Sequence, residues 1–102
     1  MINKVIVLGR VGKDVESRSF DGSSMASISL TTSKSYKKGD EWIEKTEWHD
    51  VSCWGSLADK VSGLRKGELV FVEGELNTRS YEKDGQRQYR TYVKASYIRR
   101  IV

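Results

Sequence analysis

The sequence contains no proline, one cysteine and one histidine among its 102 residues. A single cysteine excludes an internal disulfide and is typical of a reducing compartment, so we expect a cytoplasmic location. The longest uninterrupted apolar run, Val5 to Leu8, is far shorter than the roughly 20 residues that a membrane-spanning helix needs. No segment has the pattern of a signal or transit peptide.

The scarcity of histidine and cysteine also argues against catalysis. His49 and Cys53 would share one face of an extended strand, but four residues of strand separate them by roughly 13 Å, whereas a nucleophile and its base need about 3 Å. A zinc site needs three or four protein ligands, and the acidic residues show no matching spacing. A phosphate-binding glycine loop is also missing. We therefore expect no enzyme, no metal and no cofactor, and we interpret both residues as packing or interface residues.

Charge, by contrast, is plentiful and unevenly distributed. The length fits one domain, residues 1–102, and the net charge is +4 at pH 7. Residues 1–51 carry 8 basic and 8 acidic residues, whereas residues 52–102 carry 10 and 6, so the basic excess is C-terminal. A local basic region favours a polyanionic partner, although a strand face charged for solubility would have the same composition.

Because proline is absent, glycine marks the breaks in the first half of the chain. Residues 3–10 and 24–33 have the composition of strands, and the Asp-Gly pair within 20–24 predicts a turn. The segment 34–41 is basic and contains glycine, which predicts a loop. A third strand is expected over 42–54.

The second half begins with a change of period. Residues 55–67 have helical spacing, with Ser56 as the expected N-cap and a glycine at the end, which predicts a short helix of about three turns. Residues 68–76 then form a strand in which Gly74 indicates a bulge. The Asp-Gly pair within 82–86 predicts a hairpin between the last two strands.

The predicted order is three strands, one short helix and two strands. Five strands with a helix between the third and the fourth are typical of the OB-fold, a small, partly open Greek-key barrel that binds oligonucleotides. We therefore predict an all-β, five-stranded OB-fold barrel.

Three tryptophans lie in the predicted strand 42–54. Side chains on a strand alternate between its faces, so Trp42, Trp48 and Trp54 leave from one side. The opposite side carries Val51 and Cys53, which makes it the better candidate for the core. The tryptophans are therefore expected on the more solvent-exposed side, where large rings call for a functional explanation.

Tyrosines in basic and polar surroundings extend this pattern, at Tyr36, Tyr81, Tyr89 and Tyr92. Cationic side chains hold a phosphate backbone while flat rings stack on bases, a combination that binds single strands with little sequence preference. Proteins that read a duplex usually place a helix in the major groove, and the only helix expected here is short. Aromatic residues at strand positions are also common in barrel cores and subunit interfaces, so no single ring decides between these interpretations.

Four segments resemble the bacterial-type single-stranded DNA-binding proteins (SSB), in the same order and at similar spacing. They are INKVIVLGRVGKDVE, KTEWHDVSCWGSLAD, LRKGELVFVEGEL and TRSYEKDGQRQYRTYVKA, which together cover nearly the whole chain. The resemblance implies an OB-fold protomer that assembles into a homotetramer. It also implies binding of single-stranded DNA in replication, recombination and repair, in the bacterial nucleoid or in a host cytoplasm if the protein is phage- or plasmid-encoded.

The resemblance implies roles for individual residues. The four aromatic positions that stack on bases in the family correspond to Tyr36, Trp48, Trp54 and Tyr81. Tryptophan is usual at the first and the fourth, so tyrosine is expected to soften stacking there. The histidine of the TEWH motif lies near a subunit interface in the family, which implies the same for His49. The cations that we expect to pair with phosphates are Lys34, Lys37, Lys38, Arg79, Lys83, Arg87 and Arg90.

Family members typically continue past the barrel to an acidic tip that recruits replication and repair proteins, whereas this sequence stops at YIRRIV. It is either a naturally short relative or a trimmed form, and we expect no recruitment by an acidic tip. The expected function is binding and protection of single-stranded DNA, with the choice between DNA and RNA left open. Two alternatives remain: a dimeric primosome-type OB protein of replication restart, and an OB module that binds only proteins.

Overall fold

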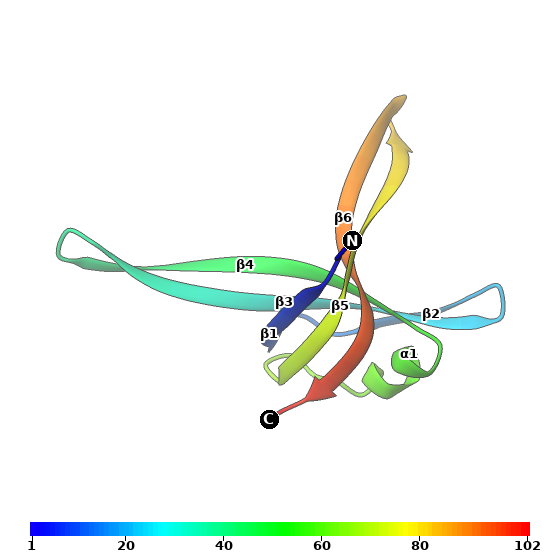
Figure 1. Ribbon diagram of the computed structural model, residues 1–102, viewed down its shortest axis with the longest axis horizontal. Helices are drawn as coiled ribbons and strands as arrows, with labels where there is room; N and C mark the ends of the chain where they lie inside the picture. The colour runs from blue at the N-terminus through cyan, green and yellow to red at the C-terminus, as the bar shows by residue number, and fades with distance from the viewer.

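The computed structural model describes residues 1–102, apart from the side chain of Phe20. The described chain forms six strands and one helix (Figure 1). In chain order the elements are β1 (Val5–Val11), β2 (Glu16–Phe20), β3 (Ser23–Lys38), β4 (Glu41–Trp54), α1 (Ser56–Val61), β5 (Leu69–Lys83) and β6 (Gln86–Arg100).

The strands form one sheet that closes on itself. Its order is β1-β5-β6-β4-β3-β2, and the end strand β1 also pairs with β3, which completes the ring. The pairing of β4 with β6 is parallel and short, joining Val51 to Val93 and Ser52 to Lys94. The other strand pairs are antiparallel. The architecture is the all-β OB-fold that the sequence predicts.

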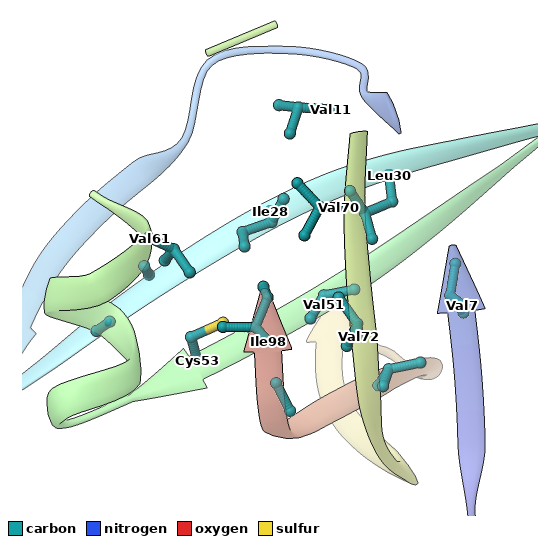
Figure 2. Packing of buried hydrophobic residues seen from close by; sticks show 14 residues of the cluster. Val7, Val11, Ile28, Leu30, Val51, Cys53, Val61, Val70, Val72 and Ile98 are labelled. Atoms are coloured by element: carbon teal, nitrogen blue, oxygen red, sulfur yellow. The ribbon is translucent and has the colours of Figure 1, made fainter. Parts of the chain in front are cut away.

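The core lies inside this ring and is built from alternate residues of the strands (Figure 2). Strands β3 and β4 contribute Ile28, Leu30, Val51 and Cys53, and β5 contributes Val70 with Val72. On each of these strands the two core residues are two positions apart. Because side chains on a strand alternate between faces, the side chain between them points to the outside of the ring. Burial of these apolar groups supplies the main driving force for folding.

The two long hairpins β3–β4 and β5–β6 extend beyond the barrel as arms, and the shorter β2–β3 hairpin projects on the side opposite the β3–β4 arm (Figure 1). The β3–β4 arm has its turn at residues 39–40, and the β5–β6 arm has its turn at Asp84 and Gly85. Asp84 and Gly85 have φ values of 52° and 76°, the left-handed conformation that a tight two-residue hairpin turn requires. Asp21 and Gly22, between β2 and β3, have φ values of 49° and 78°. Both Asp-Gly turns are therefore confirmed.

The prediction of a loop over 34–41 was wrong. Strand β3 continues to Lys38, β4 begins at Glu41, and the two strands pair without a register shift along the whole arm. Backbone hydrogen bonds to a partner strand stabilise a hairpin even where its side chains are polar and exposed, so hydrophobic alternation does not reveal it.

The strand count also differs from the five predicted, because β2 was missed. Its sequence, ESRSF, contains no alternating apolar residues, and the strand owes its conformation to pairing with β3 over residues 23–27. Strand β1 pairs with β5 along its length and with β3 at Arg10 and Val11. Strands β1 and β2 thus lie along successive parts of β3.

The helix is shorter than predicted. Helix α1 spans Ser56–Val61 rather than 55–67, and its N-cap is Gly55, with no side-chain cap hydrogen bond. Ser56 is therefore the first helical residue and not the cap. Gly67 does not end the helix, because its N–H donates to the carbonyl of Val11 at 2.8 Å in the turn before β5. The helix still buries Ala58 and Val61 against the barrel, as its spacing predicts.

The bulge predicted at Gly74 is confirmed by a register shift between Glu73 and Gly74 in the pairing of β5 with β6. A Cβ atom at Gly74 would collide with the carbonyl of Lys94 across the pair, so only glycine fits this close approach.

Along the chain that the structure describes, no helix is long and apolar enough to cross a membrane.

Candidate nucleic-acid interface

The outer face of β4 carries the tryptophans, as alternation predicts. Trp48 and Trp54 are 59% and 39% exposed, and Trp42 is exposed near the tip of the arm. Val51 and Cys53, on the inner face, are 2% and 0% exposed. One strand therefore presents core residues on one side and accessible indoles on the other.

Small polar side chains cover the sheet between Trp48 and Trp54. The register of β3 with β4 sets Thr31 beside Trp48 and Met25 beside Trp54. Between these ends, Ser29 pairs with Asp50 and Ser27 with Ser52. We call Ser27, Ser29, Asp50 and Ser52 the floor. Six residues of strand place the two indoles about 20 Å apart across it.

The floor is low because its side chains are short. Ser29 and Ser52 are buried, although they lie on the outer face of the ring. The Ser52 hydroxyl has no hydrogen-bond partner among the described residues, which is unusual for a buried polar atom. The floor thus offers hydroxyl and carboxylate groups between two large rings.

Trp48 occupies space that a glycine leaves open. A Cβ atom at Gly12 would lie 2.5 Å from Cζ3 of Trp48, 2.8 Å from its Cη2 and 2.9 Å from Cγ2 of Thr31. The N–H of Gly12 donates to the carbonyl of Ser29 at 2.8 Å, which fixes the connection between β1 and β2 beside the floor. The indole therefore rests against the backbone of this connection.

The β5–β6 arm forms a wall next to the floor. Its register pairs Arg79 with Arg90 and Tyr81 with Gln88, so Arg79, Tyr81 and Arg90 share a face. The guanidinium of Arg79 lies 4.9 Å from the ring centroid of Tyr92, within the range of a cation–π contact. Arg90 reaches across to the floor, and its Nη2 lies 2.6 Å from Oδ2 of Asp50.

A groove of about 390 Å³ separates this wall from the floor. It is lined by Lys13, Glu16, Ser27, Ile28, Ser29, Asp50, Val51, Ser52, Arg79, Tyr81, Arg90 and Tyr92. Most of the lining residues are polar or charged, with both signs of charge present, and tyrosine rings lie along the wall. Three of the predicted site residues, Arg79, Tyr81 and Arg90, meet there.

The other predicted residues of the β5–β6 arm divide between its two faces. Lys83 pairs with Gln86 and lies on the same face as Tyr81, farther out. Arg87 pairs with Glu82 on the opposite face, where its Nη1 donates to the Ser80 hydroxyl at 3.0 Å. Arg87 is thus not part of the groove.

The predicted residues of the β3–β4 arm also divide. Lys37 pairs with Trp42 and shares the tryptophan face. Tyr36 pairs with Ile43, so it leaves from the opposite face of the arm, although it is exposed. Lys34 and Lys38 lie on the same side as Tyr36. The four predicted stacking rings therefore do not share a single face of the sheet.

His49 and Cys53 lie on the inner face of β4. His49 is half-buried, and its Nε2 forms a hydrogen bond of 2.8 Å with Oγ1 of Thr32. Cys53 is buried, and desolvation raises the pKa of its thiol to about 11, so the thiol is protonated and poorly nucleophilic near neutral pH. Among the described residues there is no group of three or more histidine, cysteine, aspartate or glutamate side chains that could hold a metal ion.

Gly12, Lys13 and Glu16 neighbour the candidate site but were not predicted. Gly12 and Lys13 lie in the connection between β1 and β2, and Glu16 is the first residue of β2, where it pairs with Ser27 of β3. No local pattern marks them, because neither hydrophobic alternation nor a turn motif reports which distant strand a connection approaches.

Away from the groove, the outer face of β1 and its neighbours carries several exposed apolar residues. Ile6 and Leu8 are exposed on β1, and Leu8 pairs with Phe71 of β5. The ring of Phe71 meets that of Tyr97 on β6 edge-to-face, with centroids 6.1 Å apart. An exposed apolar patch of this kind is typical of a surface that another molecule covers. The molecule is thus an OB-fold protein with an open aromatic and polar groove on one side and an apolar patch elsewhere.

Sequence comparisons identify the family to which this fold belongs. The model of the Single-strand binding protein family matches residues 2–101. Single-stranded DNA-binding protein 1 of Chlorobaculum tepidum is 40% identical over 97 residues, which are 90% of this chain and 60% of that relative. The chain belongs to the single-strand binding protein family. It spans about 60% of the length of the Chlorobaculum relative.

Solved structures give the same result. The chain is similar to Plasmodium falciparum SSB in complex with ssDNA, with a TM-score of 0.87 and 28% identity over 100% of this chain and 96% of that one. A deletion mutant of the single-stranded DNA binding protein from Thermus aquaticus gives a TM-score of 0.83 and 27% identity, covering 99% and 51% of the two chains. A small single-stranded DNA-binding protein from Streptomyces coelicolor gives 0.77 at 22% identity over 100% and 97%, which supports the fold alone. The OB-fold prediction is confirmed.

Proposed function

We propose that this chain binds and protects single-stranded DNA, with little sequence preference. The observation that carries the proposal is the outer face of β4, where two exposed indoles flank a polar floor beside a groove with arginines and tyrosines. Rings stack on any base, and guanidinium groups hold phosphates. The names of the Chlorobaculum and Plasmodium relatives support the same function.

The geometry divides the predicted residues into two groups. Trp48 and Trp54 stack on bases along the floor, and Tyr81 adds a weaker stack at the wall. The phosphates of DNA that lies along the floor pair with cations of the wall. These are Arg79, Arg90 and Lys83, which share the wall face with Tyr81.

The remaining predicted residues serve a different part of the DNA path. Tyr36, Lys34, Lys38 and Arg87 leave from the opposite faces of their arms. They contact DNA only where the strand wraps around an arm. Lys37, near the tip of the tryptophan face, extends the path along the β3–β4 arm.

The proposal includes assembly into a homotetramer, with roles in replication, recombination and repair in the cytoplasm or nucleoid and without enzymatic activity. The apolar patch of Ile6, Leu8, Phe71 and Tyr97 supports an interface between protomers. His49, half-buried beside Thr32, is the proposed polar contact near that interface. Sedimentation separates the tetramer from the dimer that a primosome-type protein of replication restart would form.

Titration with poly(dT), followed by tryptophan emission at several salt concentrations, tests the proposal. Stacking on the indoles should quench the emission. If about four phosphates are neutralised, log affinity should fall with log salt at a slope near −3. An absence of both quenching and salt dependence would end the proposal. A module that binds only proteins would instead show the same tryptophan emission with and without poly(dT).

A further inference from the structure

A carboxylate occupies the centre of the face that we propose for DNA. Asp50 lies on β4 between Trp48 and Ser52 and lines the groove. Arg90 of β6 donates to Oδ2 of Asp50 twice, from Nη2 at 2.6 Å and from Nε at 2.9 Å. One of the arginines of the groove is therefore already engaged by an anion of the protein itself.

This ion pair is easily exchanged for another. The side chains of Arg90 and Asp50 are 64% and 41% exposed, and ion pairs in such surroundings add little to stability. The guanidinium fork of arginine matches a phosphate as well as a carboxylate. A phosphate that enters the groove can thus take the place of Asp50 without a large structural cost.

The groove contains two carboxylates, Asp50 and Glu16, and they differ in the cations with which they pair. Lys13, Arg79 and Arg90 line the groove together with Glu16 and Asp50. Glu16 has its closest cation, Arg18, at 4.0 Å, and Arg18 does not line the groove. Asp50 alone of the two carboxylates is paired to a cation of the wall.

We propose that Asp50 acts as an internal competitor for the DNA phosphate. It holds Arg90 in the DNA-free protein, and it repels the phosphate that displaces it, so it lowers the affinity for single-stranded DNA and flattens its dependence on salt. The inference rests on the proposed function. It adds an affinity-setting residue that opposes binding.

The test compares the wild type with Asp50→Asn on a dT oligonucleotide between 50 and 200 mM salt. In the variant no carboxylate is displaced when Arg90 pairs with a phosphate, so one more net charge is neutralised on binding and the salt slope should become steeper by about 0.7. If the difference in affinity between the two proteins vanishes at about 1 M salt, the variant should bind roughly eightfold more tightly at 50 mM and roughly threefold more tightly at 200 mM. Thermal unfolding of both proteins checks that the variant is folded.

Three further variants isolate the cause. Asp59→Asn makes the same change of net charge on α1, away from the groove lining, and should leave the affinity unchanged. Asp50→Glu keeps the carboxylate and should retain the wild-type slope. Asp50→Asn combined with Arg90→Gln should lose the gain. If Asp50→Asn does not fold, Asp50→Ser, which matches the neighbouring floor residues, replaces it.

The outcomes separate the two proposals. If the wild type binds the oligonucleotide and Asp50→Asn binds with the same or lower affinity and the same slope, the role of Asp50 as a competitor is wrong. Weaker binding by the variant would indicate that the carboxylate itself contacts DNA. If the wild type does not bind at any salt concentration, the proposed function fails, and this inference fails with it.

Discussion

The two faces of β4 differ sharply in burial. Val51 and Cys53 on the inner face are sealed in the core, whereas Trp48 and Trp54 on the outer face remain accessible. Burial of the inner residues stabilises the fold. The exposed indoles gain little from folding, so their presence requires another explanation, and we propose stacking on bases. Substitutions on the two faces should therefore affect different properties.

The largest effect is expected for Leu30→Ala, on the inner side of the β3–β4 pair. Leu30 lies opposite His49 in the register, is fully buried and does not line the groove. Loss of its side chain should lower the free energy of unfolding by about 2 to 5 kcal/mol, as measured by urea denaturation. The affinity of the folded protein for single-stranded DNA should not change. A large loss of affinity with unchanged stability would contradict the division between the faces.

On the outer face, Trp48→Ala should show the opposite behaviour. Loss of the stacking ring should weaken the binding of a dT oligonucleotide by about 1 to 3 kcal/mol. The free energy of unfolding should change by about 1 kcal/mol or less, because the side chain is largely exposed. Fluorescence anisotropy of a labelled oligonucleotide and urea denaturation measure the two quantities. Normal affinity in this variant would remove Trp48 from the site.

The β5–β6 arm allows a matched comparison of the same kind. Tyr81 lines the groove, and Tyr89 lies on the other face of the arm, opposite Ser80. Both rings are exposed. Tyr81→Ala should weaken oligonucleotide binding by about 1 kcal/mol, and Tyr89→Ala should leave it nearly unchanged. Equal losses would mean that DNA contacts both faces of the arm.

The smallest effect concerns Cys53 on the inner face. Burial raises the pKa of its thiol from 9.0 to about 11. Between these values the folded protein retains a proton that the unfolded chain has released, so this residue contributes stability that is lost as the pH rises from 9 to 11. The wild type should lose up to about 1 kcal/mol more than Cys53→Ala between pH 8 and pH 9.5 in urea denaturation. An identical pH dependence in the two proteins would indicate an accessible thiol.

Local patterns predicted a large part of the fold. Alternation identified the two faces of β4, and the Asp-Gly pairs located two hairpin turns. Local patterns failed where hydrogen bonding to a partner strand, and not the side-chain pattern, decides the structure. Strand β2 and the paired part of the β3–β4 arm contain few apolar residues, yet the partner strand holds them extended.

The residues of the candidate site could be proposed one by one from the sequence, but their arrangement could not. Trp48, Trp54, Tyr81 and the arginines of the wall follow from composition and from resemblance to the family. Which of them share a face depends on register between distant strands, and register places Tyr36 and Arg87 away from the groove. The contact of Asp50 with Arg90 joins residues 40 positions apart, so no local spacing reveals it.

The most direct test of the account uses Trp48 as the only tryptophan, in a variant with Trp42→Phe and Trp54→Phe. Saturation with poly(dT) should quench the emission of Trp48, because a base stacks on its indole. Addition of salt should reverse the quenching as the DNA dissociates. Binding of DNA that leaves the emission of Trp48 unchanged would contradict the claim that the outer face of β4 is the binding surface.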